Sequence, residues 1–392
     1  MTERDIVLFL GAGFSSDAGL PVMKAFGAAS DSEFETLKKR HIDVPGNSRK
    51  AAPMFVEAGE TFRLFQGFCK NSHTILDSDV QNLETIYCIA EALRESGCTE
   101  LNLGNQPYEI NVLISQIQLW LWKVYQQCPV MNPERNRDKK VNEETYKRFF
   151  PIIKNYCKRI TVISTNYDLI YEYLSWKHDV RCFYPFSNDE NVKQIEAGRG
   201  YEKYICQNEN EHPDTILMCK LHGSVNYLQN VCKDETDDLF VACDISDGNP
   251  IGKSKIKKNV PAIFAVDAIW NIRKKYGETF IPAIIPPTYA KLSHKSWLVE
   301  IWNSAFNALK NAKKIIFIGY SMPESDGFMR SLIHGAMASR NCKIPPEISE
   351  YVIDPCKKVF EEYKGFFKEM FKSEKPEDFN SAVKGTLEKL FN

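Results

Sequence analysis

The feature that most constrains the fold of this chain is an apolar run that ends in a glycine turn near the N-terminus. Ile6–Leu10 is typical of a buried β-strand, and Gly11-Ala12-Gly13-Phe14-Ser15-Ser16 is typical of a turn that opens a helix. Such a turn can bind pyrophosphate, because glycines let phosphates approach the backbone and a helix N-terminus offers N–H donors. Ser16 stands where a dinucleotide fingerprint has its third glycine, so a turn without a ligand is the alternative.

Three later segments have the same strand-like character and also end in a polar turn. Ile160–Ser164 leads into Thr165-Asn166-Tyr167-Asp168 and a predicted helix, and Lys314–Ile318 leads into Gly319-Tyr320-Ser321 and another helix. A last strand, residues 350–353, stops at Asp354-Pro355. Strands that alternate with helices in this way predict an α/β fold, a Rossmann-like parallel sheet with helices on both faces.

Two long segments interrupt this pattern and are predicted to be insertions into the sheet. Residues 30–150 carry apolar side chains at helical spacing, which predicts a helical insertion. Residues 180–290 have strand and turn character, clearest in ILMCKLHGSVNYL, which predicts a smaller β-rich insertion. The sheet and its insertions would occupy residues 1–355.

The remaining residues, 356–392, are predicted to form an amphipathic helical tail. Apolar side chains, most of them aromatic, recur at helical spacing between Val359 and Phe371. This apolar face can pack on the parent domain or form a subunit interface, and the spacing alone does not separate the two.

Charge and hydropathy exclude several classes of protein. The 50 Lys and Arg residues balance 51 Asp and Glu residues, so the net charge of −1 gives no general attraction to nucleic acid or to an anionic membrane. No apolar run approaches the roughly 20 residues that span a bilayer, and the N-terminus lacks the pattern of a signal peptide, so we expect a cytoplasmic protein. The basic segment 248–260 is more typical of a solvated loop than of a phosphate-binding patch.

The twelve cysteines do not indicate a metal site. No two of them form a CxxC pair, and the spacing of Cys206, Cys219, Cys232 and Cys243 does not match a zinc ribbon. In a cytoplasmic protein we expect most of them to be reduced and many to be buried as small apolar side chains.

The polar turns at the strand ends contain the candidate functional side chains, because open α/β sheets bind ligands at that edge. An Asn beside an Asp, as in Asn166 and Asp168, can orient hydroxyl groups or a water, although both residue types also cap helices. His222 precedes a glycine in a turn and could reach a cleft, although a single histidine is more often structural. Asp354 could accept hydrogen bonds from a ribose hydroxyl or an adenine amine.

Taken in order, the motifs GAGFS, STNYD, KLHGS, FIGYS and VIDP resemble the sirtuin-like family, over roughly residues 5–355. The match is to the branch found in bacterial antiphage systems rather than to the protein deacylases. The resemblance implies that the first motif binds the NAD pyrophosphate, that Asn166 and Asp168 hold the nicotinamide ribose, and that His222 is the base. The residues implied to bind the dinucleotide are Gly11, Ala12, Gly13, Phe14, Ser15, Gly319, Ser321 and Asp354.

The same resemblance implies an activity and a setting. The expected activity is NAD+ hydrolysis at the bond between nicotinamide and ribose, giving ADP-ribose and nicotinamide, without a metal. The expected setting is abortive infection against phage, in a homo-oligomer that works with a HerA-type ATPase or helicase. The chain has no GxxxxGK[ST] motif, so any ATPase would be a second protein.

Departures from the deacylase pattern bear on the choice of function. Deacylases follow the glycine loop with GIPDFR, whereas this chain has Gly19-Leu20-Pro21-Val22-Met23-Lys24, and it lacks both the four-cysteine zinc ribbon and a recognisable acyl-lysine segment. These departures weigh against an NAD-dependent protein deacylase. The motifs are also compatible with a catalytically inactive NAD or ADP-ribose sensing module, whereas a Rossmann dehydrogenase is the least favoured function.

Overall fold

The computed structural model describes most of the chain. The described residues are 4–20, 26–43, 52–71, 80, 82–126, 128, 141–186, 192–197, 200–230, 238–246, 261–264, 268–277, 279–285, 296–323, 326–340 and 349–391.

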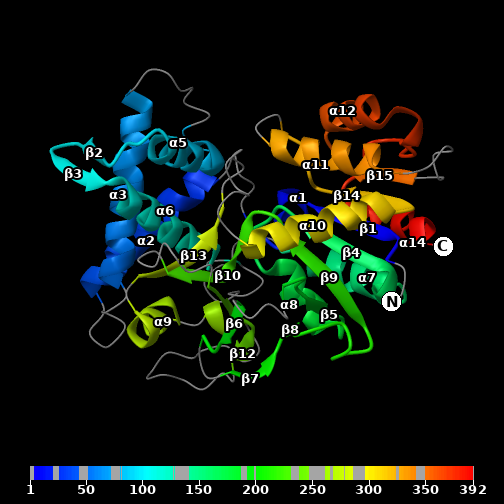
Figure 1. The fold of residues 1–392 in the computed structure, drawn as a ribbon, viewed down its shortest axis with the longest axis horizontal. Coiled ribbons are helices and arrows are strands. Elements are labelled where there is room, and N and C mark those ends of the chain that lie inside the picture. Colours follow the sequence, from blue (N-terminus) through cyan, green and yellow to red (C-terminus); the bar gives the residue numbers. More distant parts are fainter. Residues whose placement is uncertain are drawn as a thin grey trace.

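The main element of the fold is a seven-stranded sheet in which all neighbouring strands are parallel (Figure 1). This confirms the predicted α/β class. In spatial order the strands are β15 (Ser349–Ile353), β14 (Lys314–Ile318), β1 (Ile6–Leu10), β4 (Ile160–Ser164), β9 (Thr215–Lys220), β5 (Arg181–Phe183) and β8 (Ile205–Cys206).

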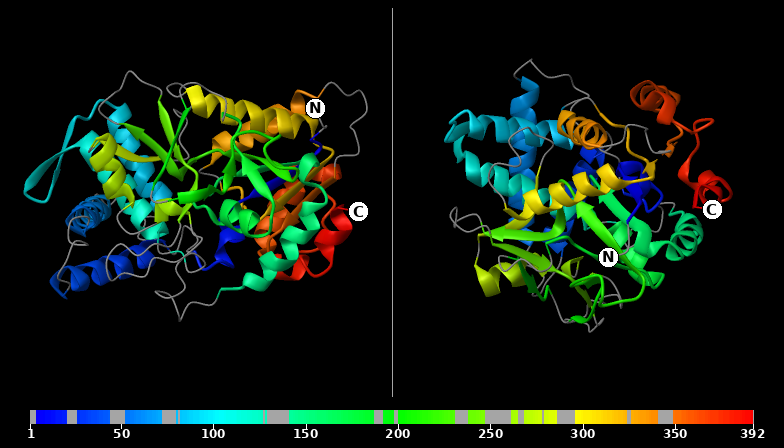
Figure 2. Two further views of the ribbon diagram at one scale, coloured as in Figure 1. Left: turned by 90° about the horizontal axis from the view of Figure 1, so that it is seen from below. Right: turned by 45° about the vertical axis from the view of Figure 1, so that its right-hand side comes forward.

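Helices cover both faces of this sheet (Figures 1 and 2), because strands that are apolar on both sides need a cover on each. In β1 every residue is buried. The helices that accompany the sheet are α1 (Ala12–Ser16), α7 (Glu143–Lys154), α8 (Ile170–Lys177), α10 (Ser296–Asn311), α11 (Gly327–Ala338) and α12 (Lys357–Phe367).

The register of the sheet places five predicted turns at the same edge of the sheet. Leu10 of β1 is paired with Ile318 of β14 and with Ser164 of β4, and the same row continues to Ile353 of β15 and Lys220 of β9. Each of these residues is the last of its strand. The glycine turns, the Asn-Asp turn, the His-Gly turn and the Asp-Pro turn therefore all begin at the same edge.

The two insertions form a second lobe beside the sheet, on the left in Figure 1. Its helices are α2 (Phe26–Asp43), α3 (Ala52–Asn71), α5 (Leu83–Glu95), α6 (Ile110–Tyr125) and α9 (Ala268–Tyr276). Its four-stranded sheet has the order β13 (Phe280–Ile284), β10 (Gly223–Asn230), β11 (Leu239–Ala242), β6 (Val192–Ile195). Two small pairs are β2 (Glu100–Leu103) with β3 (Gln106–Glu109), and β7 (Gly200–Lys203) with β12 (Asp244–Ser246).

Buried hydrogen bonds hold the helical insertion against the second sheet. Tyr87 of α5 donates its hydroxyl to the carbonyl oxygen of Ile284, the last residue of β13, over 2.8 Å. Gln118 of α6 donates to the same oxygen over 2.9 Å. The two insertions therefore share one interior, although they are far apart in the sequence.

The structure adds strands that the sequence pattern did not assign to the main sheet. β5, β8 and β9 come from the segment 180–290 yet extend the parallel sheet, and the chain leaves it only after Lys220. β5 and β8 have only three and two residues, which are too few to show a period in the sequence. The hairpin β2–β3 inside the helical insertion was also not predicted.

The C-terminal tail packs against the rest of its own chain. Tyr363 and Phe367 of α12 lie with their rings 4.9 and 5.5 Å from that of Phe317 on β14. Phe379, at the start of α13 (Phe379–Ala382), lies 5.2 Å from the ring of Phe14. The last helix, α14 (Thr386–Phe391), contacts α7.

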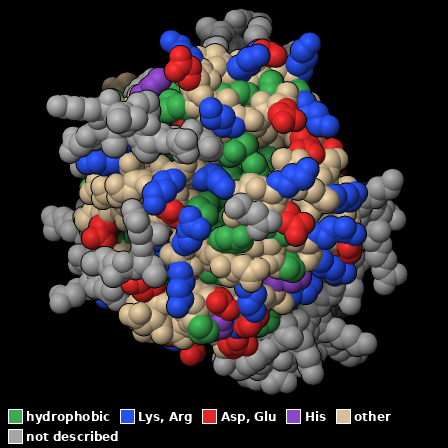
Figure 3. Space-filling view, turned by 90° about the vertical axis from the view of Figure 1, so that its right-hand side faces the viewer, with side chains coloured by type: hydrophobic (Ala, Val, Ile, Leu, Met, Phe, Trp, Pro, Cys, Tyr) green, Lys and Arg blue, Asp and Glu red, His purple; other side chains and the backbone are tan. Residues whose placement is uncertain are grey.

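The surface carries both signs of charge. Figure 3 shows the face with α7 and the C-terminal helices, where Lys and Arg side chains are widespread and acidic side chains lie among them. No helix in the described part of the chain is long and apolar enough to cross a membrane. The basic segment 248–260 lies outside the described residues.

Candidate functional site

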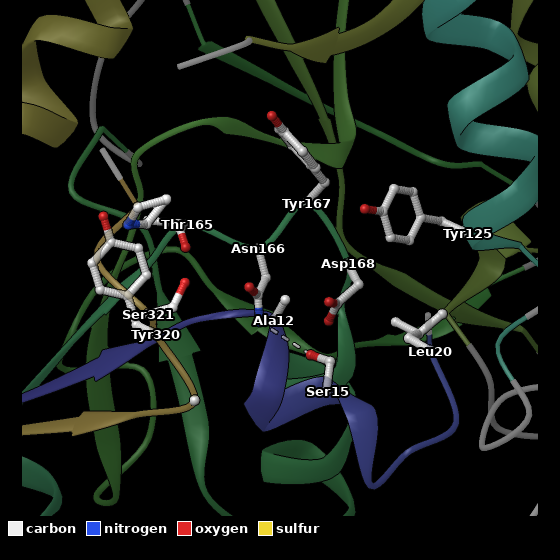
Figure 4. Close-up of a pocket in the computed structure, with 12 residues that line it drawn as sticks. Ala12, Ser15, Leu20, Tyr125, Thr165, Asn166, Tyr167, Asp168, Tyr320 and Ser321 are labelled. Carbon is white, nitrogen blue, oxygen red and sulfur yellow. Dashed lines mark hydrogen bonds between the residues drawn. The ribbon is translucent and has the colours of Figure 1, made fainter. Parts of the chain in front are cut away.

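A cavity opens where β14, β1 and β4 end (Figure 4). The space inside it, counted together with the open solvent at its mouth, is about 590 Å³. From β1 the chain crosses to β4 on one side, whereas β14 continues to β15 on the other, so the cavity lies at a topological switch point. The lining residues are Ala12, Ser15, Leu20, Tyr125, Thr165, Asn166, Tyr167, Asp168, Gly319, Tyr320, Ser321 and Pro323.

Asn166 is held in one orientation at the floor of this cavity. Its Nδ2 donates to the carbonyl oxygen of Gly11 over 2.8 Å and to Oγ of Ser15 over 3.1 Å. Its backbone N–H donates to Oγ of Ser164 over 3.1 Å. Because both amide hydrogens are engaged by the turn after β1, the amide oxygen is the group that turns away from α1 in Figure 4. The side chain thus joins the turns after β1 and β4.

The two carboxylate oxygens of the buried residue Asp168 have different surroundings. Its Oδ1 accepts a hydrogen bond of 2.9 Å from the backbone N–H of Ile170, the first residue of α8. This is the capping contact that Asp residues commonly make at the start of a helix, so one oxygen of Asp168 has the structural role of a helix cap. The residue also lines the cavity, and Oδ2 has no partner among the described residues. One carboxylate oxygen is therefore available to a ligand.

The glycines of the first and fourth motifs pack directly on each other. The backbone N–H of Gly13 donates to the carbonyl oxygen of Gly319 over 2.9 Å. A Cβ added to Gly11 or Gly13 would come within 2.5 or 2.7 Å of the turn at Gly319, so no larger residue fits. Since the N–H of Gly13 is engaged, it is not a phosphate donor in this structure.

Ala12 and Ser15 are the residues of the first turn that face the cavity. Phe14 instead points into the core, where its ring lies 5.4 Å from that of Tyr146 and 5.7 Å from that of Phe149. The helix that follows the turn, α1, has only five residues. The first motif therefore supplies the cavity with one hydroxyl and a small side chain.

His222 is buried beside the cavity and does not line it. Its Nε2 lies 3.4 Å from Oδ2 of Asp326, and that oxygen also accepts a 2.9 Å hydrogen bond from the hydroxyl of Tyr320. The backbone around His222 accepts hydrogen bonds from both lobes of the protein. Ile285 donates its N–H to the carbonyl oxygen of His222 over 2.9 Å, and Trp302 donates Nε1 to that of Leu221 over 3.1 Å.

A buried ion pair between Lys220 and Glu172 contacts the backbone of Asp168. Nζ of Lys220 is 3.2 Å from Oε1 of Glu172, and both side chains are at most 1% exposed. Lys220 also donates to the carbonyl oxygen of Asp168, and the hydroxyl of Tyr184 donates to Glu172 over 3.3 Å. Burial raises the pKa of Glu172, while the charge of Lys220 opposes this. The pair fixes the start of α8 to the end of β9.

Two more of the residues predicted to bind the dinucleotide, Ser321 and Asp354, lie in different places. Ser321 lines the cavity next to Gly319. Asp354 does not line it, and its Oδ1 accepts a 2.8 Å hydrogen bond from the N–H of Cys356, inside its own turn. Burial raises the pKa of the Asp354 carboxyl. The structure thus gathers Ala12, Ser15, Asn166, Asp168, Gly319 and Ser321 around one cavity, and leaves Gly11, Gly13, Phe14, His222 and Asp354 outside its lining.

Sequence reasoning missed three aromatic or acidic residues of this region. Tyr125 reaches the cavity from the end of α6, in the helical insertion, and no local pattern marks it. Tyr320 lies inside the fourth motif, where only the glycine and the serine were singled out. Asp326 stands at the start of α11, where an Asp predicts a helix cap.

Within the described part of the chain, no group of three or more His, Cys, Asp or Glu side chains could hold a metal ion. No protein-family model matches this sequence, and no curated protein matches it significantly.

Proposed function

We propose that this protein is an NAD+ hydrolase that breaks the bond between nicotinamide and ribose. The observation that carries the proposal is the cavity at the switch point of a parallel sheet, with Asn166 and Asp168 on its floor. Nucleotides bind at this position in open α/β sheets. The ordered motifs that resemble the sirtuin-like family add the choice of reaction.

The polar groups of the cavity suit the ribose of NAD+. The open oxygen of Asp168 can accept hydrogen bonds from ribose hydroxyls, and Ser15, Thr165 and Ser321 offer further hydroxyl groups. Tyr125 and Tyr167, whose ring centroids are 6.2 Å apart, give an apolar wall for a flat ring. The pyrophosphate would lie against the turn of Ala12 and Ser15.

The reaction needs little general acid catalysis from the protein. The C1′–N bond of the cationic nicotinamide group breaks with its electron pair going to nitrogen, so nicotinamide leaves as a neutral molecule. Water then bonds to C1′ of the ribose and loses a proton to a base, giving ADP-ribose. Asp168 would hold the ribose hydroxyls, the amide oxygen of Asn166 would accept a hydrogen bond from the water, and His222 would take the proton.

His222 needs access to the cavity for this role. Its imidazole is 1% exposed, and Oδ2 of Asp326 lies 3.4 Å from its Nε2. The proposal therefore includes a local rearrangement that brings the imidazole into contact with the cavity when NAD+ binds. Catalytic hydrogen bonds are commonly longer in structures without substrate than in the reacting complex.

The test is a product assay on the purified protein. With NAD+ we expect nicotinamide and ADP-ribose in equal amounts, and at least about 10²-fold slower release by His222→Ala and Asn166→Ala. Circular dichroism and thermal unfolding show whether the variants are folded. Folded variants that release nicotinamide at the wild-type rate would contradict the assignment of these two residues.

The burial of His222 favours one second candidate, a module that binds NAD+ or ADP-ribose without cleaving it. Isothermal titration calorimetry with NAD+ separates the two. One-to-one binding with no nicotinamide after prolonged incubation supports the module, and multiple turnovers support the hydrolase.

We propose that this activity serves antiphage defence with a HerA-type ATPase as partner, as the motifs' resemblance implies. Co-purification with the product of a neighbouring gene and loss of cellular NAD+ on infection would support this role. A protein that stays without a partner and leaves NAD+ unchanged in infected cells would contradict it.

A further inference from the structure

The carboxylate of Asp326 lies at the start of α11 but contacts His222 instead of capping the helix. Asp326 is the residue before the first turn of α11, where Asp side chains usually accept a hydrogen bond from a backbone N–H of the helix. Here the side chain makes no such bond. Its Oδ2 instead lies 3.4 Å from Nε2 of His222 and accepts the hydroxyl hydrogen of Tyr320.

Two residues of the turn that follows β14 have a positive φ. Gly319 has a φ of +61° and Met322 a φ of +50°, and this left-handed conformation is strained for a residue with a side chain, such as Met322. Arg330 of α11 donates Nη2 to the carbonyl oxygen of Met322 over 2.7 Å and supports the turn. Strain of this kind is retained mainly where it places functional groups.

We propose that Asp326 is a positioning residue for His222, with a hydrogen bond from Nε2–H of the imidazole to the carboxylate. This contact keeps the proton of the neutral ring on Nε2 and leaves Nδ1 as the nitrogen that can accept a proton. When Nδ1 takes a proton from water, the carboxylate also stabilises the imidazolium. The catalytic part of this inference rests on the proposed hydrolase function.

The tautomer can be measured without any enzymatic activity. In protein labelled with ¹⁵N-histidine, two-dimensional ¹H–¹⁵N spectra distinguish a protonated Nε2 from a protonated Nδ1. We expect His222, assigned by its loss in His222→Ala, to carry the proton on Nε2 in the wild type. In Asp326→Asn, whose amide can donate to the ring, we expect a mixture or the opposite tautomer. A wild type protonated on Nδ1, or no change in Asp326→Asn, would overturn the proposal.

The kinetic test compares two buried carboxylates. Asp326→Asn should lower kcat for nicotinamide release by about 10²–10⁴-fold with a KM within about threefold, as for other base-orienting carboxylates. Asp5→Asn is the control, because Asp5 is equally buried but pairs with Arg159 at the opposite end of β1. Asp5→Asn should lower the free energy of unfolding and leave kcat for nicotinamide release unchanged. An equal loss of kcat in both folded variants would show a merely structural role for Asp326.

The two readouts separate the failure of this inference from that of the proposed function. If the wild type binds NAD+ but releases no nicotinamide, the hydrolase proposal fails, and the spectra still decide whether Asp326 sets the tautomer of His222. If the wild type is active and Asp326→Asn has the wild-type kcat, the positioning role fails while the hydrolase stands.

Discussion

The N–H of Gly13 donates a 2.9 Å hydrogen bond to the carbonyl oxygen of Gly319, and this contact joins two turns that lie more than 300 residues apart in the sequence. It joins the turns that follow the paired strands β1 and β14, and both turns line the cavity together with the turn after β4. The glycines of both motifs are therefore required for packing, independently of any ligand.

We predict that Gly319→Ala lowers the free energy of unfolding by about 3 kcal/mol or more. The φ of Gly319 is +61°, and an added Cβ would lie 2.5 Å from the backbone of Gly13, so backbone strain adds to overpacking. Gly335→Ala in α11 is the control: its Cβ would meet nothing closer than 3.6 Å, and it should stabilise by about 0.5–1 kcal/mol. Urea denaturation of both variants measures the difference, and equal stabilities would contradict the close packing.

We predict that Asn166→Asp is as inactive in nicotinamide release as Asn166→Ala. Aspartate keeps the size of the side chain but has no N–H to donate to Gly11 and Ser15, so it cannot hold the same orientation. The measurement is the rate of nicotinamide release at saturating NAD+. Activity of Asn166→Asp near the wild-type rate would show that the two donated hydrogen bonds do not position the residue.

We predict that Lys220→Met costs about 3–5 kcal/mol, because it leaves the carboxylate of Glu172 buried without its counter-charge. The double variant Lys220→Met/Glu172→Met should recover most of this loss. Arg148→Met breaks an exposed pair with Glu144 and should change the stability by about 0.5 kcal/mol or less. A double-mutant cycle from thermal and urea unfolding checks all three, and a single Lys220→Met variant of wild-type stability would contradict the prediction.

We predict that Glu350→Gln stabilises the protein increasingly from pH 5 to pH 8. Both carboxylate oxygens of Glu350 are buried and unpaired among the described residues, and burial raises its pKa to about 8. Between the unfolded pKa and pH 8 the unfolded chain loses this proton while the folded chain keeps it. Stability therefore falls as the pH rises, by up to about 1.4 kcal/mol per pH unit, and it levels off above pH 8.

The amide of Glu350→Gln cannot ionise, so the variant lacks this decline, and its stability relative to the wild type should rise by about 3–4 kcal/mol between pH 5 and pH 8. Exposed Glu362→Gln is the control and should follow the wild-type pH profile. Denaturant unfolding at several pH values is the measurement. Parallel profiles for Glu350→Gln and the wild type would contradict a proton held by Glu350 in the folded state.

We predict that Phe379→Ala lowers the free energy of unfolding by about 3–5 kcal/mol. The ring of Phe379 contacts those of Phe14 and Phe149, so the tail covers the back of the first turn. Phe68→Ala, on the exposed side of α3, should cost about 1 kcal/mol or less. Size-exclusion chromatography of Phe379→Ala should give the wild-type elution volume, and a changed oligomer with unchanged stability would instead indicate a subunit interface.

Local patterns along the chain were sufficient for four strands of the sheet, β1, β4, β14 and β15, and for the polar turns that follow them. Apolar runs such as Ile6–Leu10 and Lys314–Ile318 predict buried parallel strands, because such strands need apolar side chains on both faces. The same patterns predicted the helices after β4 and β14. They did not reveal β5 and β8, which are too short to carry a period.

Only the tertiary structure decided which residues of these turns share a cavity. The sequence by itself determined that the Gly11, Asn166 and Gly319 turns each follow a buried strand, because strand pattern and turn chemistry are local properties. It did not determine that Tyr125 completes the cavity, or that Asp326 meets His222 across 104 residues. Those relationships depend on side-chain packing between distant segments, which leaves no period or motif in the chain.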